Sequence, residues 1–345
     1  MTLVMNVYID SISHAEWRRN SEYFTDYSVY QTWEYQQVRA ERARQRISRI
    51  LIVDDNDSPL LMGQVRIKRV PMLRLTIGYI QSGPLIQVTP YDESSALQAL
   101  IQLRQAFLGS IVNVLRLVPN IENDDHGERW IGLFSSAGFQ RVMSEPPYHT
   151  MMVSLADSPE QILSRMDREA RRIIRKAERM NIDFKEDTSE EFFDILKRLY
   201  AQAKERKGFR GIDADDFAES QKLFAEEDKA RILIAYHGNE AISAHATSHF
   251  GITAIPLITA NTPEGLKCGS SYLVWWKAYL RAKELGMQYY DLGGIDEKSN
   301  PKGYLFKKRM GGEEVSHISA FEACESRIVR KIWRTTESAY RLIKR

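Results

Sequence analysis

The sequence predicts an α/β protein with mixed sheets, built from two similar halves in tandem. Its apolar residues follow the helical period in some segments and the strand period in others. The halves also repeat one order of segments. ILIVDDND in the first half corresponds to ILIAYHGN in the second, and each precedes two strand-like runs and a helix that opens on two serines. Ser270 follows Ser94 by 176 residues, and this offset indicates a duplicated module.

The first half reads as a helix, three strands, a helix, a strand and a short helix. We expect these elements over 28–44, 49–55, 60–71, 76–85, 93–109, 112–119 and 129–139. The last helix should end at Gly138, because glycine readily adopts the left-handed conformation that terminates helices.

The second half opens with helices. Ser158, Pro159 and Gln161 form a helix-start pattern, and the helix is expected to continue to about Met180. The elements expected after it are a helix from 188 or 189 to 204, strands over 231–239, 241–251 and 252–260, a helix over 270–286, a strand over 287–294 and the helical piece GYLFKKRMGG. The order of elements in each half is that of an acyltransferase-like module on a mixed sheet.

These patterns place the first module at 1–157 and the second at 158–345. A basic helical segment at 158–230 is expected to precede the core of the second module. The C-terminal helix is expected to pack back on the first module.

Composition predicts a soluble globular protein. Apolar residues make up 43% and charged residues 27%, and a net charge of +2 excludes nucleic-acid binding by bulk charge. The only cysteines are Cys268 and Cys324, which fits a reducing cytoplasm. We find no signal-peptide core in the first twenty residues and no stretch of about 18 apolar residues, so the expected location is cytoplasmic without a transmembrane segment.

The segment 164–180 predicts an arginine ridge on one helix. At about 100° per residue, one narrow arc collects five arginines: Arg165, Arg168, Arg172, Arg175 and Arg179. The expected buried face is formed by Ile162, Met166, Ala170, Ile173 and Ala177. Arginine suits bidentate phosphate contacts, so the ridge predicts a surface for tRNA or anionic membrane. A solvated face with weak ion pairs is the alternative.

An ordered set of motifs resembles the Fem-type (FemABX) aminoacyl-tRNA-dependent transferases, which add amino acids to the stem peptide of peptidoglycan precursors. The motifs are QTWEYQQVR, IGYIQSGPL, REARRIIRKAERMNIDF, AKERKGF and YYDLGGID…GYLFKKRMGG. The likeness extends from about residue 25 to about residue 322. It implies two GNAT-like modules in tandem. No heptad segment follows in the second half, so the resemblance is to members without a coiled-coil arm.

The resemblance implies roles for particular residues. Lys307 matches the family lysine that stabilises the tetrahedral oxyanion, and Phe306 precedes it at the substrate. Arg39 and Arg206 match cations that hold the diphosphate of the precursor. Lys308, Arg309 and the ridge arginines Arg168, Arg172, Arg175 and Arg179 would contact tRNA phosphates.

The resemblance also implies partners. Aminoacyl-tRNA would be the co-substrate, with no cofactor and no metal, and the acceptor would be a nucleotide-linked or lipid-linked precursor. Peripheral association with the inner membrane surface is an open expectation.

Two departures keep alternatives open. Val118 occupies a position where some members carry an acidic residue, and residues 254–259 hold none of the tyrosines that members tend to have there. The acceptor could therefore be a peptide natural product, or the chain could bind RNA or a precursor without turnover. His245 and His249 are four residues apart and Cys268 lies at a helix start, but no third metal ligand accompanies them.

Overall fold

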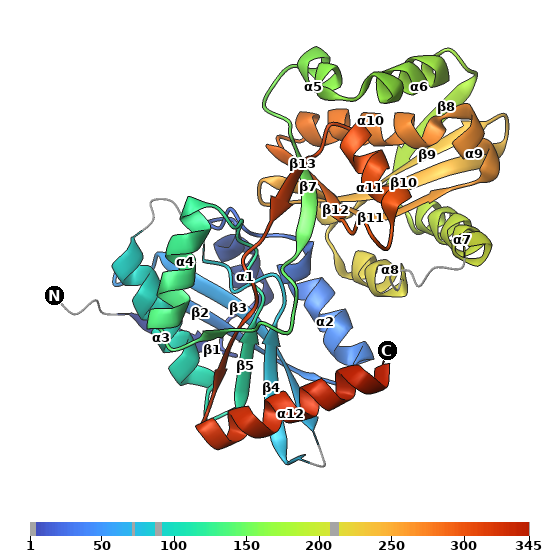
Figure 1. Cartoon of the computed structure of the whole chain (residues 1–345). Helices are drawn as coiled ribbons and strands as arrows, with labels where there is room; N and C mark the ends of the chain where they lie inside the picture. Colours follow the sequence, from blue (N-terminus) through green and yellow to red (C-terminus); the bar gives the residue numbers. More distant parts are fainter. Residues whose placement is uncertain (1–4, 71–72, 87–91, 208–213, 345) are drawn as a thin grey trace. The chain divides into compact units, whose positions relative to one another are not determined.

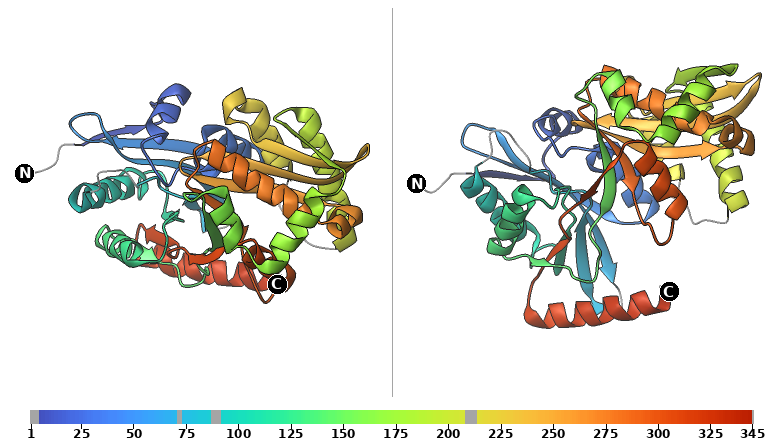
Figure 2. Two further views of the ribbon diagram at one scale, coloured as in Figure 1. Left: turned by 90° about the horizontal axis from the view of Figure 1, so that it is seen from above. Right: turned by 45° about the horizontal axis from the view of Figure 1, so that its top comes forward.

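The computed structural model describes residues 5–70, 73–86, 92–207 and 214–344, and the side chains as far as residue 339. It divides into two compact units, residues 1–148 with 316–345 (unit 1) and residues 149–315 (unit 2). Each unit contains one mixed sheet, shown in Figures 1 and 2. The predicted α/β class with two GNAT-like modules is confirmed, and no described helix is long and apolar enough to span a bilayer.

Unit 1 has the strand order β1-β2-β3-β4-β5-β14-β6. Its strands are β1 (Asn6–Ile9), β2 (Arg46–Val53), β3 (Pro59–Val70), β4 (Leu75–Ile80), β5 (Val114–Leu117), β6 (Gln140–Arg141) and β14 (Phe321–Cys324). Its helices are α1 (His14–Ser21), the 3-10 helix η1 (Val29–Gln31), α2 (Trp33–Arg42), α3 (Glu93–Phe107), α4 (Asp125–Ser136) and α12 (Arg327–Lys344). Strands β4 and β5 are parallel, and α3 connects them.

The core of unit 1 lies between the sheet and the helices α3 and α4. Phe107 of α3, Phe134 of α4 and Phe321 of β14 are fully buried there. The rings of Phe134 and Phe321 stack with centroids 4.6 Å apart. Burial of each large aromatic side chain contributes about 1.5–3 kcal/mol.

Unit 2 has the strand order β13-β7-β12-β11-β10-β9-β8. Its strands are β7 (His149–Ser154), β8 (Ile182–Asp187), β9 (Arg231–His237), β10 (Glu240–Phe250), β11 (Thr253–Asn261), β12 (Tyr289–Gly294) and β13 (Glu313–Ser316). Its helices are α5 (Pro159–Arg165), α6 (Arg168–Glu178), α7 (Glu190–Lys207), α8 (Ala214–Leu223), the 3-10 helix η3 (Glu226–Asp228), α9 (Pro263–Cys268), α10 (Ser270–Glu284) and α11 (Pro301–Arg309). Strands β11 and β12 form the parallel pair that corresponds to β4 and β5.

The units divide at 148/149 rather than at the expected 157/158, because β7 pairs within the second sheet, and unit 1 also takes in β14 from the C-terminal end of the chain. Strand β14 pairs with β5 in unit 1, and β7 pairs with β12 in unit 2. The C-terminal helix α12 follows β14 and belongs to unit 1. Residues 158–230 do not precede the second module. Their strand β8 pairs with β9, and Ala170 and Ile174 of α6 join the core beside α10.

Candidate active site

Lys307 lies on α11, directly after β12 in the chain. Asn300 caps the N-terminus of α11. Its side chain accepts a hydrogen bond from the Gly303 amide at 3.0 Å, and Pro301 occupies the first turn. The helix carries Lys307 to the end of β12. There its Nζ donates to the carbonyl oxygens of Gly293 and Gly294 at 2.8 and 2.7 Å.

The Gly-Gly pair provides those carbonyls because β12 changes conformation at its end. Gly293 has φ +79°, in the left-handed region that favours glycine. The pairing of β12 with β7 shifts register between Asp291 and Gly294. Gly293-Gly294 is therefore a strand-end turn that binds an ammonium group.

The ammonium of Lys307 lies in a poorly solvated position. Burial lowers the pKa of Lys307 to about 8, and the nearby Asp291 carboxyl opposes this shift. Asp291 is buried, and it accepts hydrogen bonds from the Thr150 hydroxyl and, at 2.7 Å, from the Gly293 amide. Burial raises the pKa of Asp291 against the effects of Thr150, Gly293 and Lys307. Lys307 and Asp291 together place at the end of β12 a cation whose pKa depends on burial and on the neighbouring carboxyl group.

The ammonium of Lys307 has one hydrogen-bond donor to spare. An ammonium group carries three N–H donors, and the carbonyls of Gly293 and Gly294 accept two of them. No acceptor for the third lies among the described residues. This donor can face an oxygen that becomes negative during a reaction, and an oriented cation of this kind is typical of oxyanion stabilisation.

Phe306 lies on an aromatic layer between α11 and α10. Its ring centroid lies 4.7 Å from that of Tyr272 and 5.6 Å from that of Trp275. The structure thus gives Phe306 a packing role that orients α11, and contact with substrate stays a prediction.

His245 belongs to a buried polar network beneath this layer. Its ring nitrogens lie 2.6 Å from the hydroxyl oxygens of Thr259 and Tyr290, and Thr247 also bonds to Tyr290. Burial, with a smaller effect of His249, lowers the pKa of His245 to about 3, so the imidazole is neutral. Among the described residues no group of histidine, cysteine and acidic side chains could hold a metal. Cys268 is buried.

The predicted ridge helix is two helices. Met166 has ψ 152°, which ends α5, and the Asp167 side chain caps α6. Arg165 therefore pairs with Asp157 and does not continue the face of α6. Ile162, Met166, Ala170 and Ala177 are buried as expected, but the isoleucine buried with them is Ile174, and Ile173 is only partly buried. A projection that treats 164–180 as one continuous helix cannot show the break between α5 and α6.

Basic residues of α6 and α11 come together in unit 2. The Asp167 amide donates to the Arg309 carbonyl oxygen at 2.9 Å, which joins the start of α6 to the end of α11. Exposed cations of α6, its C-cap and α11 include Arg168, Arg172, Arg175, Arg179 and Lys308. Arg172 is engaged by Glu169 at 2.6 Å. We define this set with Arg309 as the basic surface.

The two predicted diphosphate ligands lie in different units. Arg39 is a partly buried residue of α2 in unit 1. Arg206 is an exposed residue near the end of α7 in unit 2, and its guanidinium donates to the Asn261 carbonyl oxygen at 2.8 Å. Gly208, which follows Arg206 in the quoted motif, lies outside the described residues. Diphosphate binding stays a prediction for both arginines.

Comparison with solved structures identifies the architecture. The crystal structure of FemX is similar over 92% of this chain and 97% of that chain, with a TM-score of 0.80 and 17% sequence identity. The chain has the Fem-type fold. The resemblance predicted from the motifs is thus confirmed in fold.

Two other solved structures share the Fem-type fold more loosely. The C-terminal domain of a candidate lysylphosphatidylglycerol synthetase from Agrobacterium fabrum has a TM-score of 0.54 at 11% identity, over 91% of this chain and 93% of that chain. A conserved protein of unknown function from Bacteroides thetaiotaomicron has a TM-score of 0.58 at 8% identity, over 92% of this chain and 99% of that chain. No curated protein matches this chain in sequence.

A family model supports the chemical class of unit 2. Residues 164–304 match the acetyltransferase (GNAT) domain. The match begins before α6 and ends within α11, so it includes β12 and the turn that binds Lys307. The prediction of an acyltransferase is confirmed at the level of this domain.

Sequence reasoning missed Asp291, Thr150 and Tyr290. Asp291 was part of the quoted Asp-Leu-Gly-Gly motif, and an acidic residue inside an apolar strand was the available signal. Thr150 gave no such signal, because its contact with Asp291 depends on pairing between β7 and β12 across 141 residues.

Proposed function

We propose that the protein is an aminoacyltransferase that moves an amino acid from aminoacyl-tRNA to an amine of a peptidoglycan precursor stem peptide. The observation that carries this proposal is Lys307, a partly buried ammonium held by two carbonyl oxygens with one donor to spare. The Fem-type fold and the GNAT domain match support acyl transfer.

The reaction requires little from the protein besides position and charge. The acceptor amine attacks the ester carbonyl carbon, and its oxygen becomes an oxyanion that Lys307 stabilises. The new C–N bond forms as the C–O bond to the tRNA ribose breaks. The proton lost by the amine ends on the ribose oxygen, and an adjacent tRNA hydroxyl can relay it. This route needs no side-chain base and is compatible with Val118.

The basic surface is the proposed contact for tRNA. Arg168, Arg175 and Arg179 are exposed without a carboxylate partner among the described residues, so they can exchange counterions for phosphates. Arg39 of unit 1 and Arg206 of unit 2 each stay candidate ligands of the precursor's diphosphate, and the precursor would be nucleotide-linked or lipid-linked.

The test is transfer of labelled amino acids from a mixed pool of aminoacyl-tRNAs to purified precursors, read by mass spectrometry. Wild-type protein should add one amino acid mass to a precursor, and ribonuclease treatment of the tRNA should abolish the gain. Absence of the product with every aminoacyl-tRNA would exclude the proposal.

A second acceptor class has one supporting observation. Strand β11 carries Ala254, Ile255, Pro256, Leu257, Ile258 and Thr259, without the tyrosines expected next to a stem peptide. Replacing the precursor by short natural-product peptides in the same assay separates the two acceptors. A protein that binds precursor or RNA without turnover would yield no product in either arm.

A further inference from the structure

A single carboxylate oxygen joins strand β7 to the glycine turn of unit 2. Oδ1 of Asp291 accepts a hydrogen bond from the Thr150 hydroxyl and, at 2.7 Å, a second one from the Gly293 amide. Thr150 is fully buried, and Asp291 is 8% exposed. Hydrogen bonds to a carboxylate are stronger than those between neutral groups, and they strengthen further where water is excluded. The two donors therefore hold the carboxylate in one orientation.

The Gly293 amide depends on this carboxylate because β12 departs from regular pairing at the turn. The register of β12 with β7 shifts between Asp291 and Gly294, and Gly293 lies inside the shift. Its amide donates to the Asp291 side chain, and backbone bonding to β7 continues at the Ile295 amide, at 2.9 Å. An amide shielded from water needs such an acceptor. Asp291 thus supplies the acceptor that the shifted ladder does not.

This hydrogen bond governs the carbonyl groups that bind Lys307. Each peptide group is planar, so the amide and the carbonyl of Gly293 are related by only the two backbone dihedral angles of that glycine. With the amide fixed by Asp291 and with Gly294 paired opposite Thr150, those angles have little freedom. The carbonyl oxygens of Gly293 and Gly294 then both face Nζ of Lys307, at 2.8 and 2.7 Å. Asp291 thus acts on the position of the ammonium through the backbone.

Asp291 also acts on Lys307 through its charge. Burial lowers the pKa of Lys307 to about 8, and the Asp291 carboxylate opposes this shift. Burial raises the pKa of Asp291, and the hydrogen bonds from Thr150 and Gly293 oppose that shift in turn. Hydrogen bonds to the charged form of a group favour that form. Thr150 therefore favours ionised Asp291, and ionised Asp291 favours protonated Lys307.

In the described part of the chain, the other titratable groups on the elements around α11 do not act on the pKa of Lys307. These groups are His149 of β7, Asp296 after β12, Tyr304, Lys308 and Arg309 of α11, Glu313 and Glu314 of β13, Arg168, Glu169 and Arg172 of α6, and Tyr272 of α10. Removing the charge of Asp291 should therefore move the pKa of Lys307 downward without a compensating effect from its neighbours.

We propose that Asp291 is a positioning residue for Lys307: held by Thr150, it fixes the Gly293-Gly294 turn so that the third N–H of the ammonium faces the reacting carbonyl oxygen. The structural claim stands on unit 2 alone. The role in amino acid transfer rests on the proposed function. Asp291 exchanges no proton with the substrate in this assignment.

The test uses variants that separate shape from charge. Asp291→Asn keeps an oxygen that can accept from Thr150 and Gly293, but it removes the charge. Thr150→Val keeps the volume and removes the hydroxyl, and Thr150→Ser restores the hydroxyl. Thr262→Val is the matched control, because Thr262 is a partly buried threonine of unit 2 whose hydroxyl donates to the Ile242 carbonyl oxygen at 3.2 Å.

The first readout is the pKa of Lys307 itself. It is followed by NMR of ¹³C-lysine-labelled protein, and the signal is assigned by its absence in Lys307→Met. In wild type the titration should be centred at about pH 8. Asp291→Asn and Thr150→Val should titrate at lower pH, whereas Thr150→Ser and Thr262→Val should stay near wild type. This measurement needs neither tRNA nor precursor.

The second readout is single-turnover transfer. Asp291→Asn and Thr150→Val should lower the maximal rate about 10-fold with little change in KM, because the donor they misplace acts in the transition state. The fall in rate at high pH should begin at lower pH than in wild type. Thr150→Ser should recover most of the rate, and Thr262→Val should keep it.

Two results would overturn the proposal: an unchanged pKa of Lys307 in folded Asp291→Asn, or a normal transfer rate in Thr150→Val. The titration of Asp291→Asn decides the question even where Thr150→Val does not fold. The two proposals also fail separately. A lowered pKa of Lys307 in the variants without transfer by wild type refutes the proposed function alone. Transfer by wild type with an unchanged pKa in the variants refutes the positioning role alone.

Discussion

The ammonium of Lys307 lies 2.8 Å from the carbonyl oxygen of Gly293, a residue with φ +79°. The Gly293-Gly294 turn and helix α11, which begins seven residues after Gly294, thus act together on one cation. This contact predicts how the charge of Lys307, the pH and the backbone conformation of Gly293 affect amino acid transfer and stability.

Lys307→Met should lower the rate of amino acid transfer about 10²–10³-fold, because one oriented donor to the oxyanion is lost. Precursor binding should be nearly unchanged. Lys302→Met, at an exposed position of the same helix, is the matched control and should keep full activity. A normal rate for Lys307→Met in single-turnover transfer assays would remove Lys307 from the mechanism.

The pH dependence should report the same group. With a pKa of about 8, Lys307 is mostly protonated at neutral pH and loses its charge as the pH rises further. The transfer rate should therefore show a limb that falls through about pH 8, and Lys307→Arg should move this limb upward. If Lys307→Arg leaves the pH of this fall in rate unchanged, the fall is due to the titration of another group.

Stability should change with pH in the opposite sense. The folded pKa of Lys307, about 8, lies below its ordinary value of 10.5, so the unfolded state binds more protons between these values. The free energy of unfolding should therefore gain a contribution as the pH rises from about 8 to about 10.5. Urea titrations across this range should show that the free energy of unfolding rises more steeply with pH in wild type than in Lys307→Met. An equal pH dependence in the two proteins would contradict the shift in the pKa of Lys307.

Gly293→Ala should destabilise the protein by about 1–2 kcal/mol, because alanine at positive φ is strained. Relief of this strain would move the Gly293 carbonyl that accepts from Lys307 Nζ, so transfer should fall too. Gly294→Ala is the matched control, since Gly294 has no positive φ, and it should cost less. If urea unfolding shows an equal loss of unfolding free energy in Gly293→Ala and Gly294→Ala, the turn does not depend on glycine at position 293.

The basic surface should be visible in the salt dependence of tRNA binding. Arg175→Gln should reduce the magnitude of the slope of log K against log salt by about 0.7–0.9, if the arginine contacts one phosphate. Arg281→Gln is the control, because Arg281 is paired with Glu186 and Glu284. A slope unchanged by Arg175→Gln would exclude this arginine from the tRNA contact.

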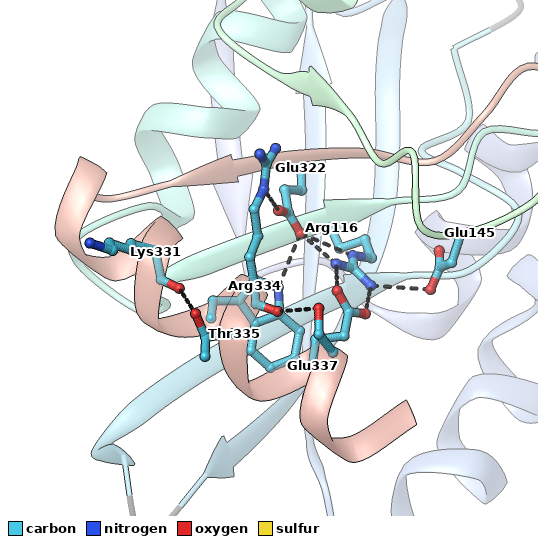
Figure 3. A network of polar contacts seen from close by, with 9 residues as sticks. Arg116, Glu145, Glu322, Lys331, Arg334, Thr335 and Glu337 are labelled. Carbon is cyan, nitrogen blue, oxygen red and sulfur yellow. Dashed lines mark hydrogen bonds and ion pairs between the residues drawn. The ribbon is translucent and has the colours of Figure 1, made fainter. Parts of the chain in front are cut away.

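Arg116→Met should destabilise unit 1 by about 3–5 kcal/mol, because it leaves the buried Glu322 without its partner (Figure 3). Arg116→Met with Glu322→Leu should recover much of the loss. Guanidinium unfolding of the two variants measures this.

Several features were predictable because their causes are local. The capping box at Ser158 and the glycine after α4 depend on neighbouring backbone groups, and both predictions are confirmed. The duplication was predictable because both copies repeat the same order of helical and strand periods in their apolar residues. Lys307 was singled out by a motif that brings a turn and a helix together within twenty residues.

By itself, the sequence determined the α/β class, the two similar modules and the cationic helix after the Gly-Gly turn, since these depend on periodicity and short-range contacts. Only the tertiary structure decided that β14 belongs with β5 and β7 with β12, and that the charge of Arg116 is neutralised by Glu322. Strand pairing and charge compensation join residues up to about two hundred positions apart. Such contacts are set by the packing of whole elements, and a local pattern carries no record of them.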